Sequence, residues 1–258
     1  MWVPKMKKRK ILSSARDKNC QAAQAGPGGA RRQRAVHLSY GMAAKNKADG
    51  PTTAAPLIPA NPTLEKLRDA ARTCRACNLW ERATQTVFGE GAAKARVMLL
   101  GEQPGDREDL AGRPFVGPAG WLLDKALERA GIAREVVYVS NVVKHFNWEP
   151  RGKRRIHKKP NAGEIAACRP WLDTEIALVK PRAIVCLGAT AAQALLGRTF
   201  KVTAHRGEFV PSPLAPIVVA TVHPSSLLRA PDDETRHRET ARFIDDLKRV
   251  ARRLAAGG

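Results

Sequence analysis

The chain has 258 residues and is strongly basic, with 45 lysines and arginines against 24 aspartates and glutamates and a formal net charge of +21. This balance favours a polyanionic partner, most commonly nucleic acid, although a basic proteome gives the same composition. No stretch reaches the roughly 20 apolar residues of a transmembrane helix, and no secretory leader is recognisable, so we expect a cytoplasmic protein without a membrane partner.

The first 62 residues differ in composition from the rest of the chain. They are rich in Ala, Pro, Gly and basic residues and contain few large apolar side chains. Such a segment cannot bury enough surface to offset the entropy cost of ordering it. We predict a disordered basic tail over residues 1–62, whose first 41 residues could also precede a true start at Met42, and a folded domain over residues 63–258.

From residue 63 onward, helical and strand patterns alternate. Spacing of apolar residues predicts strands over residues 95–102, 135–143, 181–188 and 215–224, and helices over residues 63–80, 118–132, 161–180, 189–197 and 239–256. This alternation is typical of a three-layer α/β/α domain with a central, mostly parallel sheet. Ligands of such sheets bind beyond the carboxyl ends of the strands, where this chain has GEQPGD, NVVKH, LGAT and HPSS.

Two of these strand ends carry side chains suited to chemistry. GEQPGD, at residues 101–106, places a carboxylate and an amide on a glycine-rich loop, and Phe115 beyond it offers a stacking face. His223 in HPSS is suited to donate a hydrogen bond to a developing anion. Each feature by itself is more often structural, as a turn or as a histidine that caps one.

Five cysteines in a protein expected to be cytoplasmic indicate a metal or cluster site rather than a disulfide framework. Cys74 and Cys77 form a CxxC pair, and Cys168 lies in a predicted helix. Cys186 lies within an apolar strand and is interpreted as a buried core thiol. Cys20 falls in the basic tail.

Four motifs together resemble those of the family 4 uracil-DNA glycosylases. In chain order they are GEQPG at 101–105, GRPFVGPAG at 112–120, SNVVK at 140–144 and HPSSLL at 223–228. Their order and spacing match as well, from residue 67 to about residue 254. The resemblance implies cleavage of the N-glycosidic bond of a flipped-out uracil nucleotide. We expect the substrate to be single-stranded, uracil-containing DNA and the enzyme to be a monomer.

The same resemblance implies a set of substrate contacts. Phe115 would stack on uracil, Asn141 would read the edge of the base, and His223 would stabilise the departing uracil anion. The other expected contacts lie over the base and sugar or hold phosphates, and they are Gln103, Asp106, Ser225 and Ser226.

One departure from the family pattern concerns its iron–sulfur cluster. Family members have a cysteine directly after NVVK, where this chain has His145. Cys74, Cys77 and Cys168 match the other three ligands, which implies a [4Fe–4S] cluster held by these cysteines and His145, because an imidazole can replace a thiolate on iron. Zinc, for which three cysteines and a histidine are a common ligand set, is an alternative, as is a His145 that faces DNA.

A second departure is the basic segment RGKRRIHKKP at residues 151–160, where ordinary members have a short connection. Its charge predicts a phosphate-binding surface, with Arg154 and Arg155 bringing the loop onto DNA. GEQPG combined with KRRIH also resembles the UdgX branch, in which the histidine of this loop attacks the sugar and remains bound. The resemblance implies this part for His157, with Glu102 orienting or deprotonating it.

Three functions follow from these observations. The first is uracil excision that ends in a covalent adduct between His157 and the sugar C1′. The second is a conventional family 4 glycosylase of base excision repair, in which the KRRIH loop only binds DNA. The third is a non-catalytic iron–sulfur protein that holds nucleic acid, although such a binder would not need Glu102, Asn141 and His223 together.

Overall fold

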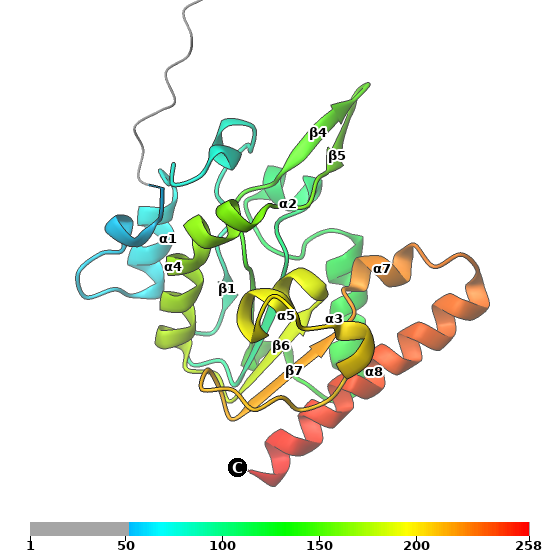
Figure 1. Ribbon diagram of the computed structural model, residues 1–258. Coiled ribbons are helices and arrows are strands. Elements are labelled where there is room, and N and C mark those ends of the chain that lie inside the picture. Colours follow the sequence, from blue (N-terminus) through cyan, green and yellow to red (C-terminus); the bar gives the residue numbers. More distant parts are fainter. Residues whose placement is uncertain (1–51, 258) are drawn as a thin grey trace, which may run out of the picture. The chain divides into compact units, whose positions relative to one another are not determined.

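The computed structural model describes residues 52–257 (Figure 1). Most of the predicted tail, with Cys20 and Met42, therefore lies outside the described residues. The described part of that segment, residues 52–62, packs against the domain: Ala54 is fully buried and its N–H donates to Ala167 O at 2.8 Å. This contact depends on a small side chain and a main-chain hydrogen bond. The prediction of disorder considered only large apolar side chains and therefore missed it. The folded part thus includes residues 52–62.

A five-stranded sheet forms the centre of the domain, in the order β1-β3-β2-β6-β7. Four strands are parallel, namely β2 (Val97–Gly101), β3 (Val137–Asn141), β6 (Ala183–Leu187) and β7 (Ile217–Thr221). The short β1 (Glu90–Gly91) pairs antiparallel with β3, so the sheet is mixed. The prediction of a mostly parallel sheet is confirmed.

Helices cover both faces of this sheet (Figure 1). Met98 and Leu100 point to one face, which packs against α1 (Leu64–Ala71), α4 (Ala162–Val179) and α5 (Ala189–Leu196). Val97 and Leu99 point to the other face, which packs against α3 (Pro118–Ala130) and α8 (Asp233–Ala256). Successive residues of a strand face opposite sides, so an entirely apolar strand builds two cores and a three-layer domain.

Several helix boundaries differ from the prediction. The first predicted helix ends at Ala71, so the CxxC segment is a loop that leads into η2 (Asn78–Glu81). The last helix begins earlier than predicted because the Asp232 side chain caps it by accepting from Thr235 N. The remaining short helices are η1 (Ala55–Leu57), α2 (Asp106–Ala111), η3 (Arg134–Val136), α6 (Val202–His205) and α7 (Pro224–Leu228). None of the helices in residues 52–257 is long and apolar enough to cross a membrane.

The basic KRRIH segment, expected as a loop, is a β-hairpin. β4 (Trp148–Arg151) pairs antiparallel with β5 (Arg154–His157), and Trp148 lies opposite His157. Gly152 forms the turn with a φ of +59°, a conformation that glycine adopts without strain. The hairpin projects from the domain near α2 (Figure 1). It therefore presents His157 on a regular strand rather than on a flexible loop.

Candidate active site

A cavity of about 620 Å³ opens at the carboxyl ends of the strands, and we call it the strand-end pocket. Side chains from four strand ends reach it, together with the hairpin and the loop before α3. Its predicted members are Glu102, Gln103, Phe115, Asn141, His157, His223 and Ser225. Asp106, Arg155 and Ser226 are not among its lining residues. The strand-end rule therefore located the pocket, and most of the expected side chains meet there.

Phe115 and Asn141 lie against the same glycine. A Cβ built on Gly101 would come within 2.3 Å of Asn141 Oδ1 and 2.9 Å of Phe115 Cζ, so only glycine permits both side chains. The Phe115 main chain has a φ of +56°, which is uncommon for a non-glycine residue. It lies directly over Gly120, where a Cβ would meet Phe115 O at 1.7 Å. The GRPFVGPAG motif thus serves to hold one aromatic ring over the pocket.

Glu108, which the sequence did not single out, fixes this loop. Its buried carboxylate accepts the Gly117 N–H at 2.8 Å, just where α3 begins. Gly105 also packs against this carboxylate, since a Cβ there would meet Glu108 Oε2 at 2.6 Å. The loop that holds Phe115 in its strained conformation is therefore fixed by a side chain of α2.

His223 is held as a neutral ring. Burial lowers the pKa of His223 to about 4, so the imidazole carries no charge near neutral pH. Its Nδ1 accepts the Ser225 main-chain N–H at 3.1 Å and lies 2.8 Å from Ser225 Oγ. Because Nδ1 is the acceptor, the proton resides on Nε2, which is left to donate. A neutral donor of this kind suits a departing anion, as predicted for His223.

His157 and Glu102 form an ion pair or hydrogen bond across the pocket. His157 Nε2 lies 3.1 Å from Glu102 Oε1, and the His157 side chain is 51% exposed, so it is accessible to a substrate. Thr190 Oγ1 donates to the other oxygen of Glu102. Burial tends to raise the pKa of Glu102, but the hydrogen bonds from His157 and Thr190 outweigh it and hold the pKa below its ordinary value. The carboxylate is therefore charged and directed at the histidine.

Gln103 lines the pocket, but its amide is already engaged. Nε2 donates to Asn147 O and to Lys158 O, each at 3.1 Å, and Oε1 accepts from Asn147 N at 3.1 Å. These residues flank the hairpin on both sides. Gln103 thus fastens the base of the hairpin that carries His157, and its expected base or sugar contact stays a prediction.

Arg155 and Asp106 likewise bind each other. Arg155 Nε lies 2.5 Å from Asp106 Oδ1, and Nη1 lies 2.5 Å from Oδ2 of the fully buried Asp109. The guanidinium also lies over the rings of Phe146 and Trp148, at 5.4 and 5.6 Å from their centroids. Together with Asp109, which the sequence analysis missed, Arg155 and Asp106 lock the hairpin onto α2. The expected phosphate contact of Arg155 and substrate contact of Asp106 stay predictions.

The two serines after His223 lie in the short turn of α7. Ser225 Oγ contacts His223 Nδ1, as described above, and Ser226 Oγ donates to His223 O at 2.7 Å. Ser225 lines the pocket and Ser226 is exposed beside it. Their expected phosphate contacts stay a prediction, and the contacts seen here serve to orient His223.

Three predicted cluster ligands lie near one another. Cys74, Cys77 and Cys168 are free thiols, and the neighbouring cysteines contribute to the raised pKa of both Cys77 and Cys168. Burial is the largest cause, and it raises the pKa of Cys77 to about 11 and that of Cys168 to about 12. Trp171 Nε1 donates to Cys74 Sγ at 3.4 Å. Within residues 52–257, however, no three His, Cys, Asp or Glu side chains lie at metal-binding distance.

His145, the expected fourth ligand, is buried and 4% exposed, so the alternative in which it faces DNA is wrong. Burial lowers the pKa of His145 to about 4, which leaves the neutral form that binds metals. Thr86 Oγ1 donates to Ala71 O at 2.8 Å and so accepts from His145 Nε2 at 2.9 Å. Nδ1 is then unprotonated and suited to coordination. Three thiols and a neutral imidazole are thus chemically suited to hold a metal or cluster. The distances between these four side chains in the structure are larger than a bound metal would require.

Cys186 is a buried core thiol, as interpreted from the sequence. It is fully buried within β6, and burial raises its pKa to about 12. It faces the core formed with α1 and α4 and does not line the strand-end pocket.

Comparisons with known proteins agree with this geometry. A family model described as the uracil DNA glycosylase superfamily matches residues 88–248. The chain is 40% identical over 175 residues to the type-4 uracil-DNA glycosylase of Pyrobaculum aerophilum, which covers 65% of this chain and 86% of the relative.

Two further relatives extend the comparison. The type-4 uracil-DNA glycosylase of Thermotoga maritima is 40% identical over 174 residues, covering 67% of this chain and 87% of the relative. The type-5 uracil-DNA glycosylase of Pyrobaculum aerophilum is 31% identical over 217 residues, covering 76% and 86%. On the evidence of its fold, its pocket and these matches, the chain belongs to the uracil-DNA glycosylase superfamily.

Proposed function

We propose that the chain removes uracil from DNA and that His157 then captures the sugar at C1′ in a covalent adduct. The glycosylase activity is supported by the family and by relatives named as uracil-DNA glycosylases. The observation that carries the covalent step is the 3.1 Å contact between His157 Nε2 and Glu102 Oε1 at the wall of the strand-end pocket.

Base recognition would use the side of the pocket that is formed by Phe115 and Asn141. Phe115 would stack on a flipped-out uracil, and Asn141, 3% exposed, would pair with its edge. His223 Nε2–H would donate to the base as negative charge develops on it. The glycosidic bond breaks with its electron pair leaving on uracil, and a hydrogen-bond donor in a site shielded from water lowers the energy of that anion.

Capture of the sugar would use His157 and Glu102, which also line the pocket. Bond breaking leaves positive charge on the sugar, which the ionised Glu102 stabilises. A nitrogen of His157 forms the new bond to C1′, and the imidazole gives up its proton to Glu102, so that charge and protons balance. A nucleophile already held within about 3.5 Å of its target has a large entropic advantage over a diffusing water molecule. The resulting C–N bond lacks a good leaving group at neutral pH, so the enzyme stays attached.

The hairpin contacts support this assignment. Gln103 holds the two ends of the hairpin, and Arg155 holds one strand to Asp106 and Asp109. A nucleophile must be held in a fixed position, whereas a loop that only contacts phosphates can stay flexible. The anchoring of the hairpin therefore favours a catalytic role for His157. The conventional turnover glycosylase nevertheless remains the second candidate, since the same pocket could admit water to C1′.

A gel separates the two candidates. The protein is incubated with a uracil-containing single-stranded oligonucleotide and run under denaturing conditions. A slow-migrating protein–DNA species is expected, whereas an abasic product with free protein would support conventional turnover. An unchanged oligonucleotide would overturn both and favour a nucleic-acid-binding protein. A duplex with the same uracil tests the expected preference for single strands.

The cysteine site would hold a [4Fe–4S] cluster through Cys74, Cys77, Cys168 and His145. Burial that raises thiol pKa values would be offset by a cationic centre, which keeps thiolates ionised. When bound, the cluster would cross-link the CxxC loop, the turn after β3 that carries His145, and α4. Its role would be structural, because glycosidic cleavage moves no electrons. Iron and sulfide analysis with absorbance near 400 nm tests this, and a colourless protein that contains zinc would contradict it.

A further inference from the structure

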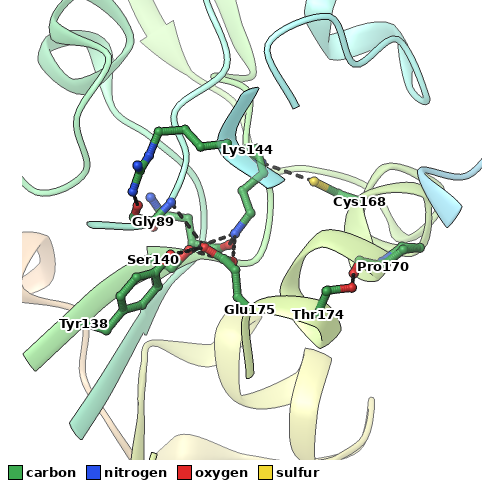
Figure 2. A network of polar contacts seen from close by, with 10 residues as sticks. Gly89, Tyr138, Ser140, Lys144, Cys168, Pro170, Thr174 and Glu175 are labelled. Atoms are coloured by element: carbon green, nitrogen blue, oxygen red, sulfur yellow. Dashed lines mark hydrogen bonds and ion pairs between the residues drawn. The ribbon is translucent and has the colours of Figure 1, made fainter. Parts of the chain in front are cut away.

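A buried ion pair lies between β3 and α4 and takes no part in the chemistry described above. The side chains of Lys144 and Glu175 are 1% and 0% exposed, and Lys144 Nζ contacts Glu175 Oε2. Tyr138 Oη and Ser140 Oγ donate to the same carboxylate at 2.8 and 3.0 Å, as does Gly89 N at 3.2 Å (Figure 2). The carboxylate is therefore fully hydrogen-bonded, which is the condition for holding a charge away from water.

The ammonium of this pair also reaches the main chain of a pocket residue. Lys144 Nζ donates to Asn141 O at 2.7 Å and to Ser140 Oγ at 2.8 Å. At the other end of the same turn, the Lys144 N–H donates to Cys168 Sγ at 3.3 Å (Figure 2). The Lys144 side chain thus folds back over residues 141–144 and ties the turn to α4.

The rest of the turn is tied to β2. Val142 N and Val143 N donate to Gly101 O and Glu102 O, each at 3.0 Å. Both acceptors belong to the segment that also carries the catalytic carboxylate. The buried main-chain carbonyl of Asn141 needs a hydrogen-bond donor, and the Lys144 ammonium supplies it.

The Asn141 side chain has little else to orient it. Among residues 52–257, no hydrogen bond involves its amide group, which leaves both the oxygen and the nitrogen available to a base. Its Oδ1 rests on Gly101, where it makes only van der Waals contact. The direction of this amide therefore depends on the main chain of Asn141, which is held on one side by the pairing of β3 with β2 and on the other by Lys144.

We propose that Lys144 is a positioning residue for uracil recognition: held by Glu175, its ammonium fixes the Asn141 main chain and thereby aims the Asn141 amide at the base. This inference rests on the proposed function, because it needs Asn141 to pair with uracil. Contacts to the sugar and phosphates come from other strand ends. Loss of the ion pair should therefore weaken recognition of the base and spare the rest.

The test uses the double variant Lys144→Met with Glu175→Gln, which shortens the lysine side chain by only one atom, keeps the length of the other and removes both charges. Changing Lys144 alone would leave a buried, unpaired carboxylate. The matched control is Arg206→Met with Asp246→Asn, a pair at 2.9 Å with 10% and 11% exposed side chains that lies outside the pocket. Two single-stranded oligonucleotides serve as probes, one with 2′-fluoro-deoxyuridine, which resists cleavage, and one with a tetrahydrofuran abasic analogue.

The double variant is expected to lose about tenfold in affinity for the fluorouridine strand, the value of one good hydrogen bond, and to bind the abasic strand as the unmodified protein does. The control variant should change neither affinity. Equal losses on both strands would mean a merely structural role and overturn the proposal, as would unchanged affinities. If the double variant does not fold, Lys144→Gln with Glu175→Gln is compared, which also removes both charges but keeps a polar group at each position, and a smaller loss in the same direction is expected.

Failure of the proposed function would look different. In that case the unmodified protein would bind the fluorouridine strand no better than a matching thymidine strand. That result would overturn the proposed function and the inference with it, whereas uracil-selective binding that persists in the double variant overturns only the role of Lys144.

Discussion

Replacing Arg155 by methionine separates two roles for the hairpin. Its charge alone predicted a phosphate contact, whereas the structure pairs the guanidinium with Asp106 and Asp109, each at 2.5 Å. Asp109 is fully buried and Arg155 is 20% exposed. If the pairing is the main role, the variant loses stability and adduct formation together.

The size of the effect follows from what the substitution leaves behind. Among the described residues, the Asp109 carboxylate would keep only the Thr84 main-chain N–H, at 2.9 and 3.1 Å from its two oxygens. Removing one partner of a buried ion pair lowers the free energy of unfolding by about 3–5 kcal/mol. Because Arg155 is partly exposed, we expect a loss at the lower end, about 3 kcal/mol. For a domain of roughly 200 residues this lowers Tm by about 6–12 °C. His157 lies two residues further along the same strand, and a displacement of about 1 Å can cost on the order of a hundredfold in rate.

Thermal melting, single-turnover adduct formation and the salt dependence of DNA affinity are measured on the same preparations. The control is Arg154→Met, at the neighbouring exposed position, which should leave Tm unchanged and lower the salt slope by about one. The reasoning is refuted if Arg155→Met keeps the Tm and the adduct rate of the unmodified protein and lowers only the salt slope.

Four further outcomes are expected. Gly120→Ala places a Cβ 1.7 Å from Phe115 O, so it should displace the ring and weaken binding of a 2′-fluoro-deoxyuridine strand; full affinity would contradict this. Thr190→Val removes one hydrogen bond that keeps the Glu102 pKa low, so the acidic limb of the adduct rate should move to higher pH, and an unmoved limb would count against it. An NMR titration of the His223 ring should give a pKa of about 4, and a ring that stays protonated at neutral pH would exclude the neutral donor. Cys168→Ser should lose iron and the absorbance near 400 nm, and retention of both would remove Cys168 from the ligand set.

The sheet and the position of the pocket were predictable because they depend on local patterns. Four apolar runs of strand length each form a buried strand, and the polar residues after them converge as the rule for parallel sheets requires. Thr190 even lies in LGAT, one of the strand ends singled out, but its hydrogen bond to Glu102 spans 88 positions. Nothing in the sequence near Thr190 reports that contact.

The parts that could not be predicted depend on pairing between distant residues. Asp109 and Glu108 read as ordinary acidic residues of a short helix, and only the folded chain brings Arg155, 46 positions away, against Asp109. The resemblance implied a substrate contact for Gln103, which stays a prediction, but it did not reveal that the Gln103 amide binds the flanks of the hairpin. The charge of the KRRIH segment predicted a phosphate contact for Arg155, but a count of basic residues does not reveal which of them form internal ion pairs.

The central claim is that His157 becomes bonded to the sugar, and peptide mapping of the adduct tests it most directly. The protein is reacted with a uracil-containing oligonucleotide, digested with nuclease and trypsin, and analysed by tandem mass spectrometry. Cleavage after Arg155 and Lys158 isolates His157 in residues 156–158, whereas His223 falls in residues 207–229. A deoxyribose-derived mass on His157 within residues 156–158 is the predicted result. The same mass on residues 207–229, or abasic DNA with no modified peptide, would contradict it.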